Sequence, residues 1–219
     1  MAWVGRGDAG TGGRRAPQGA AMFKENTMTT RPDVYLLRHG ETQWNKTGRI
    51  QGQMNSDLTE LGQAQAAQQG AILRRLGDQV AGLDRFASPL SRTQATARIA
   101  FGGAEFTNDA RLIEIGCGAW EGITPAQRQA RDPDLVARSP QDLDLYFNAP
   151  MGEGLPALRS RIEDFLNSLT APAIIVSHKV SLIVMRACLT GITDEQMYDL
   201  TATQGTVIRI SGGVETHLA

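Results

Sequence analysis

Two short runs of apolar residues constrain the fold of this chain more than any other feature. Val34-Tyr35-Leu36-Leu37 and Ala173-Ile174-Ile175-Val176 are continuous rather than alternating, and both are rich in residues that favour strands. Strands that are buried on both faces have this pattern, and they belong to parallel sheets that helices cover on either side. We therefore predict an α/β fold, a three-layer α/β/α sandwich around a mostly parallel sheet.

Helical patterns separate the strands. Thr59 is a candidate N-cap for a helix that Gly77 ends, and Ser88 is expected to cap a second helix with Pro89 at its first position. The apolar stripe of the first helix is predicted to run through Leu61, Ala64, Ala67 and Ala71. Further helices are expected over 155–169 and 180–190, and further strands over 85–87 and 206–210.

Composition divides the rest of the chain. Residues 1–30 are Gly-rich and lack apolar periodicity, so we expect a disordered leader or a mis-assigned start, followed by a domain over 31–219. Residues 124–152 are polar and interrupted by prolines, and are expected to form a cap-like insertion over one edge of the sheet. The glycine pattern at 5–10 matches a dinucleotide-binding motif, but no buried strand precedes it, so we interpret it as chance.

Charge and reactive residues exclude several classes of function. The 219 residues include 22 Lys and Arg and 23 Asp and Glu, and a net charge of −1 does not favour nucleic-acid binding. No apolar stretch is long enough for a transmembrane helix, so no membrane partner is expected. Cys117 and Cys188 favour a reducing, cytoplasmic location. The three separated histidines do not have the spacing of a metal site.

A histidine follows each of the two strong strands. Arg38-His39-Gly40 comes directly after the first apolar run, and Ser177-His178 after the second. The carboxyl ends of parallel strands open onto the ligand crevice of such a sheet, so both histidines are expected to line one crevice. There a neutral imidazole can act as a nucleophile, and the guanidinium group of Arg38 can bind phosphate.

Two further positions add charged groups at strand ends. Arg92 is expected in the first turn of a helix, where free backbone N–H groups already favour an anion. Glu114 and Glu121 stand in a Gly-rich segment that also contains Trp120, and a carboxyl group there can serve as a general acid. The spacing alone does not decide between these two glutamates.

Four blocks of residues follow one another in a specific order. They are Arg38-His39-Gly40-Glu41-Thr42 with Trp44-Asn45, Ser88-Pro89-Leu90 with Arg92, Glu114 before Gly118-Ala119-Trp120-Glu121-Gly122, and Ser177-His178. In this order the chain resembles the histidine phosphatase superfamily, the phosphoglycerate mutase-like family, from about Val34 to Ile210. The resemblance implies a phosphoglycerate mutase-like fold and catalysis with no metal and no other cofactor.

The resemblance also implies roles for the charged residues. His39 would attack a phosphoryl group and become phosphohistidine, while Arg38, Arg92 and His178 would bind the phosphoryl oxygens. His39 must be neutral to attack, so we expect a backbone carbonyl group to hold one of its ring nitrogens. Asn45 would add a hydrogen bond in the same pocket.

The remaining implied role belongs to the acid. Glu114, rather than Glu121, would protonate the leaving oxygen and later activate water. On this basis we predict a metal-independent phosphomonoester hydrolase that acts through phosphohistidine on a small phosphorylated metabolite. The sequence does not indicate an oligomeric state.

Two alternative functions stay open. A cofactor-dependent phosphoglycerate mutase would place basic residues over the pocket, and residues 124–152 supply Arg128, Arg131 and Arg138. The segment between the acid and the second histidine is shorter than in true mutases, which favours a phosphatase. A non-catalytic phospholigand-binding module would keep the pocket but would need no proton donor.

Lys179 departs from the family pattern, in which glycine is common after the second histidine. It could lend charge to an anionic substrate or point away from the site. Other phosphate chemistries lack their motifs. Neither Cys117 nor Cys188 has an arginine six positions later, and the chain contains no Gly-Lys pair of a P-loop.

Overall fold

The computed structural model describes residues 1–2, 31–139 and 141–219. Most of the predicted leader, with the glycine pattern at 5–10, lies outside the described residues. Of the helices in the described ranges, none has both the length and the apolar character that crossing a membrane requires.

A six-stranded sheet forms the centre of the molecule, in the order β3-β2-β4-β1-β5-β6. The strands are β1 (Val34–Arg38), β2 (Asp84–Ala87), β3 (Thr107–Asn108), β4 (Ala173–Ser177), β5 (Val207–Ser211) and β6 (Val214–Leu218). The pairs β1–β4, β4–β2 and β2–β3 are parallel, whereas β5 is antiparallel to both β1 and β6. The sheet is therefore mostly parallel, as predicted. β6 was not predicted, because its residues are largely polar and exposed and form no apolar run.

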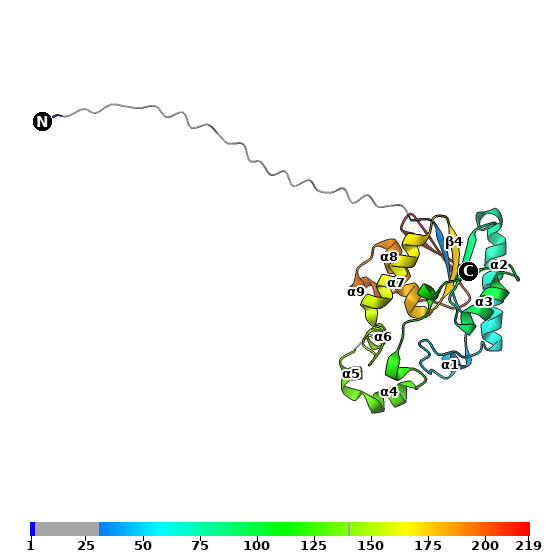
Figure 1. Ribbon diagram of the computed structural model, residues 1–219, viewed down its shortest axis with the longest axis horizontal. Coiled ribbons are helices and arrows are strands. Elements are labelled where there is room, and N and C mark those ends of the chain that lie inside the picture. The colour runs from blue at the N-terminus through cyan, green and yellow to red at the C-terminus, as the bar shows by residue number, and fades with distance from the viewer. Residues whose placement is uncertain (3–30, 140) are drawn as a thin grey trace.

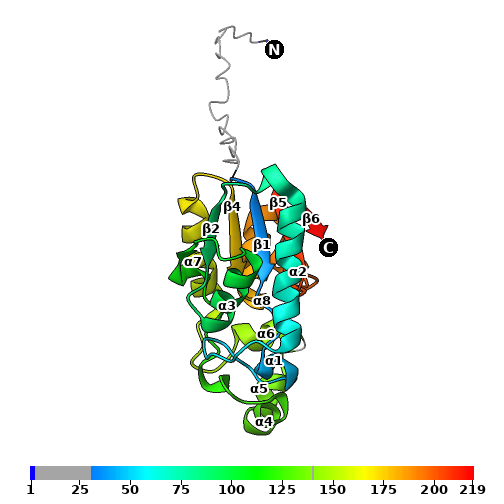
Figure 2. The same ribbon diagram turned by 90° about the vertical axis from the view of Figure 1, so that its right-hand side faces the viewer.

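Helices cover both faces of this sheet (Figures 1 and 2). One face carries α2 (Glu60–Leu76) and α3 (Ser91–Ala100), and the other carries α7 (Gly154–Ser168) and α8 (Lys179–Thr190). The shorter helices are α1 (Gln43–Lys46), α4 (Pro125–Arg131), α5 (Pro133–Ala137), α6 (Asp142–Phe147) and α9 (Asp194–Met197), and 3₁₀ turns cover Gly77–Gln79, Ala110–Leu112 and Gly118–Trp120. These layers confirm the predicted α/β/α sandwich.

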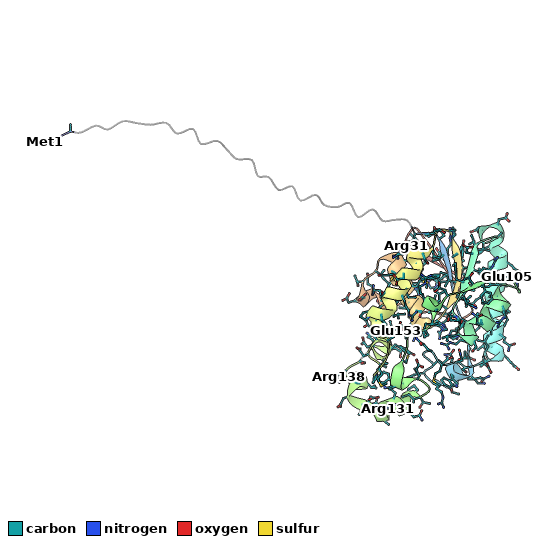
Figure 3. The ribbon with its side chains drawn as sticks, in the orientation of Figure 1. Met1, Arg31, Glu105, Arg131, Arg138 and Glu153 are labelled. Atoms are coloured by element: carbon teal, nitrogen blue, oxygen red, sulfur yellow. The ribbon has the colours of Figure 1, made fainter. Side chains whose placement is uncertain are left out.

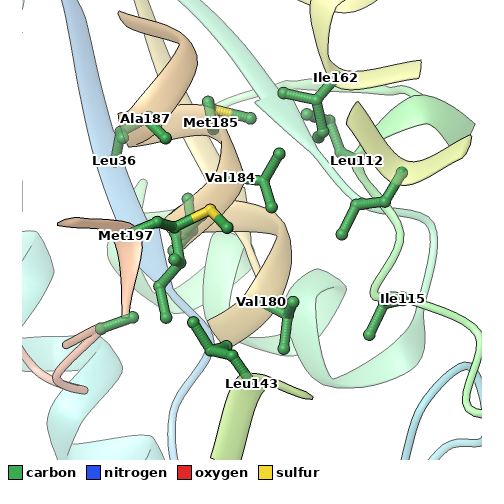
Figure 4. Packing of buried hydrophobic residues seen from close by; sticks show 14 of the residues in the cluster. Leu36, Leu112, Ile115, Leu143, Ile162, Val180, Val184, Met185, Ala187 and Met197 are labelled. Carbon is green, nitrogen blue, oxygen red and sulfur yellow. The ribbon is translucent and has the colours of Figure 1, made fainter. Parts of the chain in front are cut away.

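Alternate residues of the central strands supply two apolar cores. Leu36 of β1 belongs to the larger core with side chains from α7 and α8, among them Ile162 and Val184 (Figure 4). Its neighbour Leu37 faces the opposite core, which includes Leu73 of α2. Because each of these strands is buried on both sides, its sequence contains no polar position until the strand ends.

Helix α2 begins and ends as predicted, but its buried face does not follow the predicted stripe. Thr59 accepts a hydrogen bond from the backbone of Gly62, and Gly77 is the C-cap. Leu61 is 54% exposed, and the residues that face the core are Gly62, Ala66, Gln69, Gly70, Ile72 and Leu73. The predicted stripe through Leu61, Ala64, Ala67 and Ala71 is therefore wrong.

Close contacts between backbone atoms explain why α2 turns a different face to the core than predicted. A Cβ atom added to Gly62 would lie 2.0 Å from the carbonyl oxygen of Glu41, and one added to Gly70 would lie 2.8 Å from that of Ala100. Gln69 is buried on the same face, where its amide donates to the carbonyl oxygens of Arg38 and Thr206. A pattern search based on apolar residues assigns neither glycine nor glutamine to a core face.

Replacement of Gly62 by alanine is expected to destabilise the protein. In an exposed helix the same change stabilises by about 1 kcal/mol, but here the added methyl group meets backbone atoms and forces a shift that costs about 1–3 kcal/mol. Urea denaturation measures the difference, and Gln63→Ala on the exposed side of α2 is the control. A Gly62→Ala variant as stable as this control would contradict the close contact.

The start of α3 also differs from the prediction. The helix begins at Ser91 with Leu90 as its N-cap, so Ser88 is not the cap and Pro89 is not the first helical residue. Ser88 instead accepts a hydrogen bond from the backbone of Leu90 within a turn. Arg92 nevertheless lies in the first turn of the helix, as predicted.

The segment 124–152 contains α4, α5 and α6, which lie at the end of the molecule that also carries α1 (Figure 1). Leu143 and Leu145 of α6 are buried in the larger core, so this part is packed against the sandwich. Arg131 and Arg138 lie near its outer end (Figure 3). They donate to the carbonyl oxygens of Ala119 and Asp134, and hence to neighbouring loop and helix backbone.

Candidate active site

The ends of β1, β2 and β4 bring the predicted residues together. The backbone of His39 donates to the carbonyl oxygen of Ser177, at 3.0 Å, and that of Ser88 to the carbonyl oxygen of Val176, also at 3.0 Å. These bonds continue the sheet past its last paired residues. The rings of His39 and His178 consequently lie with their centroids 5.2 Å apart, and both residues are buried.

The ring of His39 is held in one tautomer. Its Nδ1 atom lies 2.8 Å from the carbonyl oxygen of Gly40, and because a carbonyl oxygen only accepts, Nδ1 carries the proton. The lone pair is then on Nε2, as a nucleophile requires. Burial, followed by the charges of Arg92 and Arg38, holds the pKa of His39 well below its usual range. The expected backbone partner is present, and the lowered pKa favours the neutral ring.

The second histidine is also neutral but has the opposite tautomer. The Nε atom of Arg92 donates to Nδ1 of His178 at 3.2 Å, so the proton is on Nε2, which donates to the hydroxyl oxygen of Ser88 at 2.8 Å. Burial lowers the pKa of His178 well below its usual range, and the charge of Arg92 lowers it further. The two rings thus present one nucleophilic nitrogen and one N–H donor.

These lowered pKa values predict how stability depends on pH. In the unfolded chain, histidines have a pKa near about 6.5, so below that pH the unfolded chain binds protons that the folded protein excludes. The free energy of unfolding therefore falls as pH falls below about 6.5, by up to about 1.4 kcal/mol per pH unit for each buried histidine. Urea denaturation between pH 7 and pH 5 measures this slope, which is expected to be smaller in His178→Asn. Equal slopes for the two proteins would contradict the assignment.

Two arginines, the buried Arg92 and the half-buried Arg38, place positive charge beside the histidines. Arg92 is 1% exposed, and its terminal nitrogens donate to the carbonyl oxygens of Met54 at 2.6 Å and Gly52 at 2.7 Å. Burial lowers the pKa of Arg92 to about 10, so it remains a cation at neutral pH. Arg38 donates through Nη1 to the carbonyl oxygen of Ala202, while its buried Nε has no partner in the described part of the chain. An unpaired buried donor of this kind suits an anion.

The structure places Glu114, and not Glu121, at the cavity, a distinction that spacing in the sequence could not make. The carboxylate of Glu114 accepts backbone hydrogen bonds from Ile115 and from Val180 and Ser181 in the first turn of α8. It lines the same cavity as His39. Glu121 is not among the lining residues, and its carboxylate accepts instead from the backbone of Gln53 and Cys117.

The cavity at this edge of the sheet has a volume of about 60 Å³, with room for a few water molecules or one small group. Five of the six predicted site residues line it, namely Arg38, His39, Asn45, Arg92 and Glu114, and His178 contacts the ring of His39. A larger cavity of about 220 Å³ lies between α2 and α3 at the other end of the strands, lined mainly by apolar residues and glycine. Within the described ranges, no three or more His, Cys, Asp or Glu side chains are grouped to hold a metal ion.

Several residues of the site were not predicted. Gln204 donates to the carbonyl oxygen of His39 at 3.1 Å and lies 3.4 Å from the Asn45 Oδ1 atom, and Thr96 accepts from the backbone of Gly40. Arg49 and Tyr146 line the cavity. Thr96, Tyr146 and Gln204 are remote in sequence from the histidine blocks, whereas Arg49 follows the first block closely. A single polar residue in a loop or helix carries no signal of such a contact.

Comparison with known proteins matches residues 34–216 to the family model of the histidine phosphatase superfamily (branch 1). The chain belongs to the histidine phosphatase superfamily. It is 35% identical over 166 residues to a protein named probable phosphoglycerate mutase GpmB from Erwinia tasmaniensis, covering 73% of this chain and 75% of the relative. It is 31% identical to phosphoserine phosphatase 1 from Hydrogenobacter thermophilus, covering 73% of this chain and 76% of that protein.

A solved structure of this superfamily has the same fold. The α-ribazole phosphatase from Shigella flexneri superposes with a TM-score of 0.71 at 28% identity, covering 84% of this chain and 93% of the other. The predicted family and its phosphoglycerate mutase-like fold are thereby confirmed.

In this member of the superfamily, Glu121 is connected to Arg92 through the loop that contains Gly52 and Gln53. Its carboxylate binds the backbone of Gln53, and the neighbouring carbonyl oxygens of Gly52 and Met54 bind Arg92. Loss of the carboxylate leaves the backbone N–H groups of Gln53 and Cys117 without their acceptor, which loosens the loop.

We expect Glu121→Ala to weaken binding of vanadate, a phosphate analogue, by about three- to tenfold, since a lost hydrogen bond costs about 0.5–1.5 kcal/mol. Glu121→Gln keeps an oxygen acceptor and is expected to restore most of the affinity. Inhibition constants for vanadate measure both effects. Equal affinities for Glu121→Ala and the unaltered protein would refute the connection to Arg92.

Proposed function

We propose that this member of the superfamily is a metal-independent phosphomonoester hydrolase that forms phosphohistidine at His39 and acts on a small phosphorylated metabolite. The observation that carries the proposal is the neutral, fixed ring of His39, whose proton is on Nδ1, in one cavity with Arg38, Arg92 and Glu114. A binding module would need neither a nucleophilic nitrogen nor an acid.

In the first step, Nε2 of His39 forms a bond to phosphorus while the bond from phosphorus to the ester oxygen breaks. Glu114 gives its proton to the leaving oxygen, so that the product leaves as an alcohol. Arg38 and Arg92 offset the negative charge on the equatorial phosphoryl oxygens. Asn45 supplies its amide group as a further donor, and His178 supplies its Nε2 proton in exchange for its bond to the Ser88 hydroxyl.

In the second step, water attacks phosphorus and the bond to Nε2 breaks, which releases inorganic phosphate and neutral His39. Glu114, now a carboxylate, takes a proton from this water and returns to its acid form. Hydrogen bonds from Ile115, Val180 and Ser181 fix the position of its carboxyl group at the cavity. Two guanidinium groups provide the positive charge that both steps need.

The mutase remains the second candidate, because the chain is 35% identical to proteins named probable phosphoglycerate mutase. A mutase must hold phosphohistidine away from water, whereas a hydrolase must admit water. In the segment 124–152, Arg131 and Arg138 donate to backbone carbonyl groups, and Arg128 lies over the ring of Trp120. The three arginines are thus bound by groups of their own segment or next to it. This supports hydrolysis, because a mutase would place basic residues over the pocket.

The test is a phosphatase screen of the intact protein in a metal chelator, with and without 2,3-bisphosphoglycerate. We expect release of inorganic phosphate without added metal or bisphosphate, and acid-labile, base-stable labelling of the protein by a radiolabelled substrate. A requirement for the bisphosphate with no release of phosphate would favour the mutase. Binding of phosphate compounds with neither turnover nor labelling would favour the binding module.

A further inference from the structure

Lys179 lies next to the catalytic histidine pair and inside the same cavity. It is the first residue of α8, directly after His178, and it lines the cavity together with His39. Its ammonium nitrogen lies 2.6 Å from the Oδ2 atom of Asp142 and 5.6 Å from the centroid of the Tyr146 ring. Both partners belong to α6, so Lys179 connects the active site to the segment 124–152.

The ion pair between Lys179 and Asp142 is much more exposed to solvent than the ion pair that joins α8 to β6. The side chains of Lys179 and Asp142 are 32% and 59% exposed, whereas those of Arg186 and Glu215, which join α8 to β6, are 2% and 19% exposed. An exposed pair contributes little to stability, because both groups are well solvated when apart. Another anion can therefore replace Asp142 as the partner of Lys179 at a small cost in free energy.

The charges around the cavity leave room for a second anion. Its lining contains four cations, Arg38, Arg49, Arg92 and Lys179, and one carboxylate, Glu114. A phosphoryl group bound to Arg38 and Arg92 uses two of these cations. Arg49 lies over the ring of Trp44 and donates to the carbonyl oxygen of Gly122, so within the described residues it has no carboxylate partner. While Asp142 is paired with Lys179, one phosphate dianion offsets the net positive charge; once Asp142 is released, the positive charge of the lining exceeds what that dianion offsets.

We propose that Lys179 is a specificity-determining residue that binds a second anionic group, a carboxylate or a second phosphate, on the alcohol part of the substrate. In the free protein, Asp142 holds the ammonium group over the ring of Tyr146. When substrate binds, its second anion replaces Asp142, whose carboxylate is released into solvent. This inference rests on the proposed hydrolysis at His39 and names the class of substrate: phosphomonoesters with another acidic group.

Matched substrate pairs test the inference. 3-Phosphoglycerate and glycerol 3-phosphate differ by a carboxylate, and fructose 1,6-bisphosphate and fructose 6-phosphate differ by a phosphate. We expect Lys179→Met to lower kcat/KM by about tenfold to a hundredfold for the doubly anionic member of at least one pair. For the singly anionic member we expect a change of no more than about twofold. The pair that responds identifies the second anion.

Asp142→Asn is expected to change kcat/KM in the opposite direction from Lys179→Met. Removal of the competing carboxylate is expected to raise kcat/KM for the doubly anionic substrate by about two- to fivefold. Lys46→Met, an exposed lysine of α1 outside the cavity, is the control and is expected to change neither value. A purely structural ion pair would instead make Lys179→Met and Asp142→Asn lose activity together, with all substrates.

Binding to His39→Ala separates failure of this inference from failure of the proposed function. Thermal shifts of this variant with each substrate report affinity without turnover. We expect the doubly anionic ligand to bind more tightly and to lose that preference when Lys179→Met is added. Equal binding within both pairs, or a preference that survives Lys179→Met, overturns the inference even if the intact protein is an active hydrolase. If the intact protein hydrolyses none of the four compounds while the preference is present, the proposed function fails and the anion site stands.

Discussion

Replacement of His39 by alanine is expected to abolish labelling of the protein and to lower kcat/KM for hydrolysis by at least about 10³-fold. The variant lacks the Nε2 atom that would form the bond to phosphorus, and no other described residue presents a neutral imidazole at this position: the nearest ring, that of His178, has its lone pair engaged by Arg92. Steady-state hydrolysis and radiolabelling of the same samples measure the two losses.

His178→Ala is the matched control for this experiment. It removes a buried neutral histidine of the same size but leaves the proposed nucleophile, so activity is expected to fall while labelling is retained. Circular dichroism and urea denaturation establish that both variants are folded. Activity of His39→Ala comparable to that of the intact protein would remove the basis for a phosphohistidine intermediate.

Glu114→Gln has an effect that depends on the leaving group. The amide cannot give a proton to the leaving oxygen, so hydrolysis of an alkyl phosphate is expected to fall by about 10²- to 10⁴-fold. p-Nitrophenolate leaves without a proton, so formation of phosphohistidine from p-nitrophenyl phosphate is expected to remain fast. Water then attacks slowly because its proton has no acceptor, and rapid mixing should show a burst of p-nitrophenol followed by slow turnover.

Glu121→Gln is the control for this prediction, since Glu121 holds a loop and lies outside the cavity. It is expected to affect alkyl and aryl substrates equally and to show no burst. Equal losses for both substrates in Glu114→Gln, without accumulation of phosphohistidine, would exclude Glu114 as the proton donor.

The parts of the fold that could be predicted are those determined by local pattern. β1 and β4 are buried on both faces, so their apolar runs are uninterrupted, and the histidines that end them mark the edge of the sheet. The contacts of α2 were not predictable in this way. Its inner face is formed by Gly62 and Gly70, which pack through backbone atoms that leave no hydrophobic signal.

The same distinction applies to the site. His39, His178 and Arg92 stand at strand ends or in the first turn of a helix, which is a position that a sequence can indicate. Tyr146 and Gln204 reach the site from distant loops or helices, and only the packed chain brings them there. Spacing did not distinguish Glu114 from Glu121, and the family resemblance indicated Glu114. In the structure, Val180 and Ser181 in the first turn of α8 donate to the carboxylate of Glu114.

The contacts of Arg92 bear on how the reaction product departs. In the free protein each terminal nitrogen already donates one N–H group to a carbonyl oxygen, of Met54 or of Gly52, so a phosphoryl group binds through the remaining N–H groups or replaces these acceptors. That exchange subtracts from the affinity for every ligand with a phosphoryl group, including inorganic phosphate. When phosphate departs, the two carbonyl groups can bind the guanidinium again, so no buried charge is left bare. For the proposed hydrolysis, we therefore expect these two carbonyl groups to promote release of inorganic phosphate.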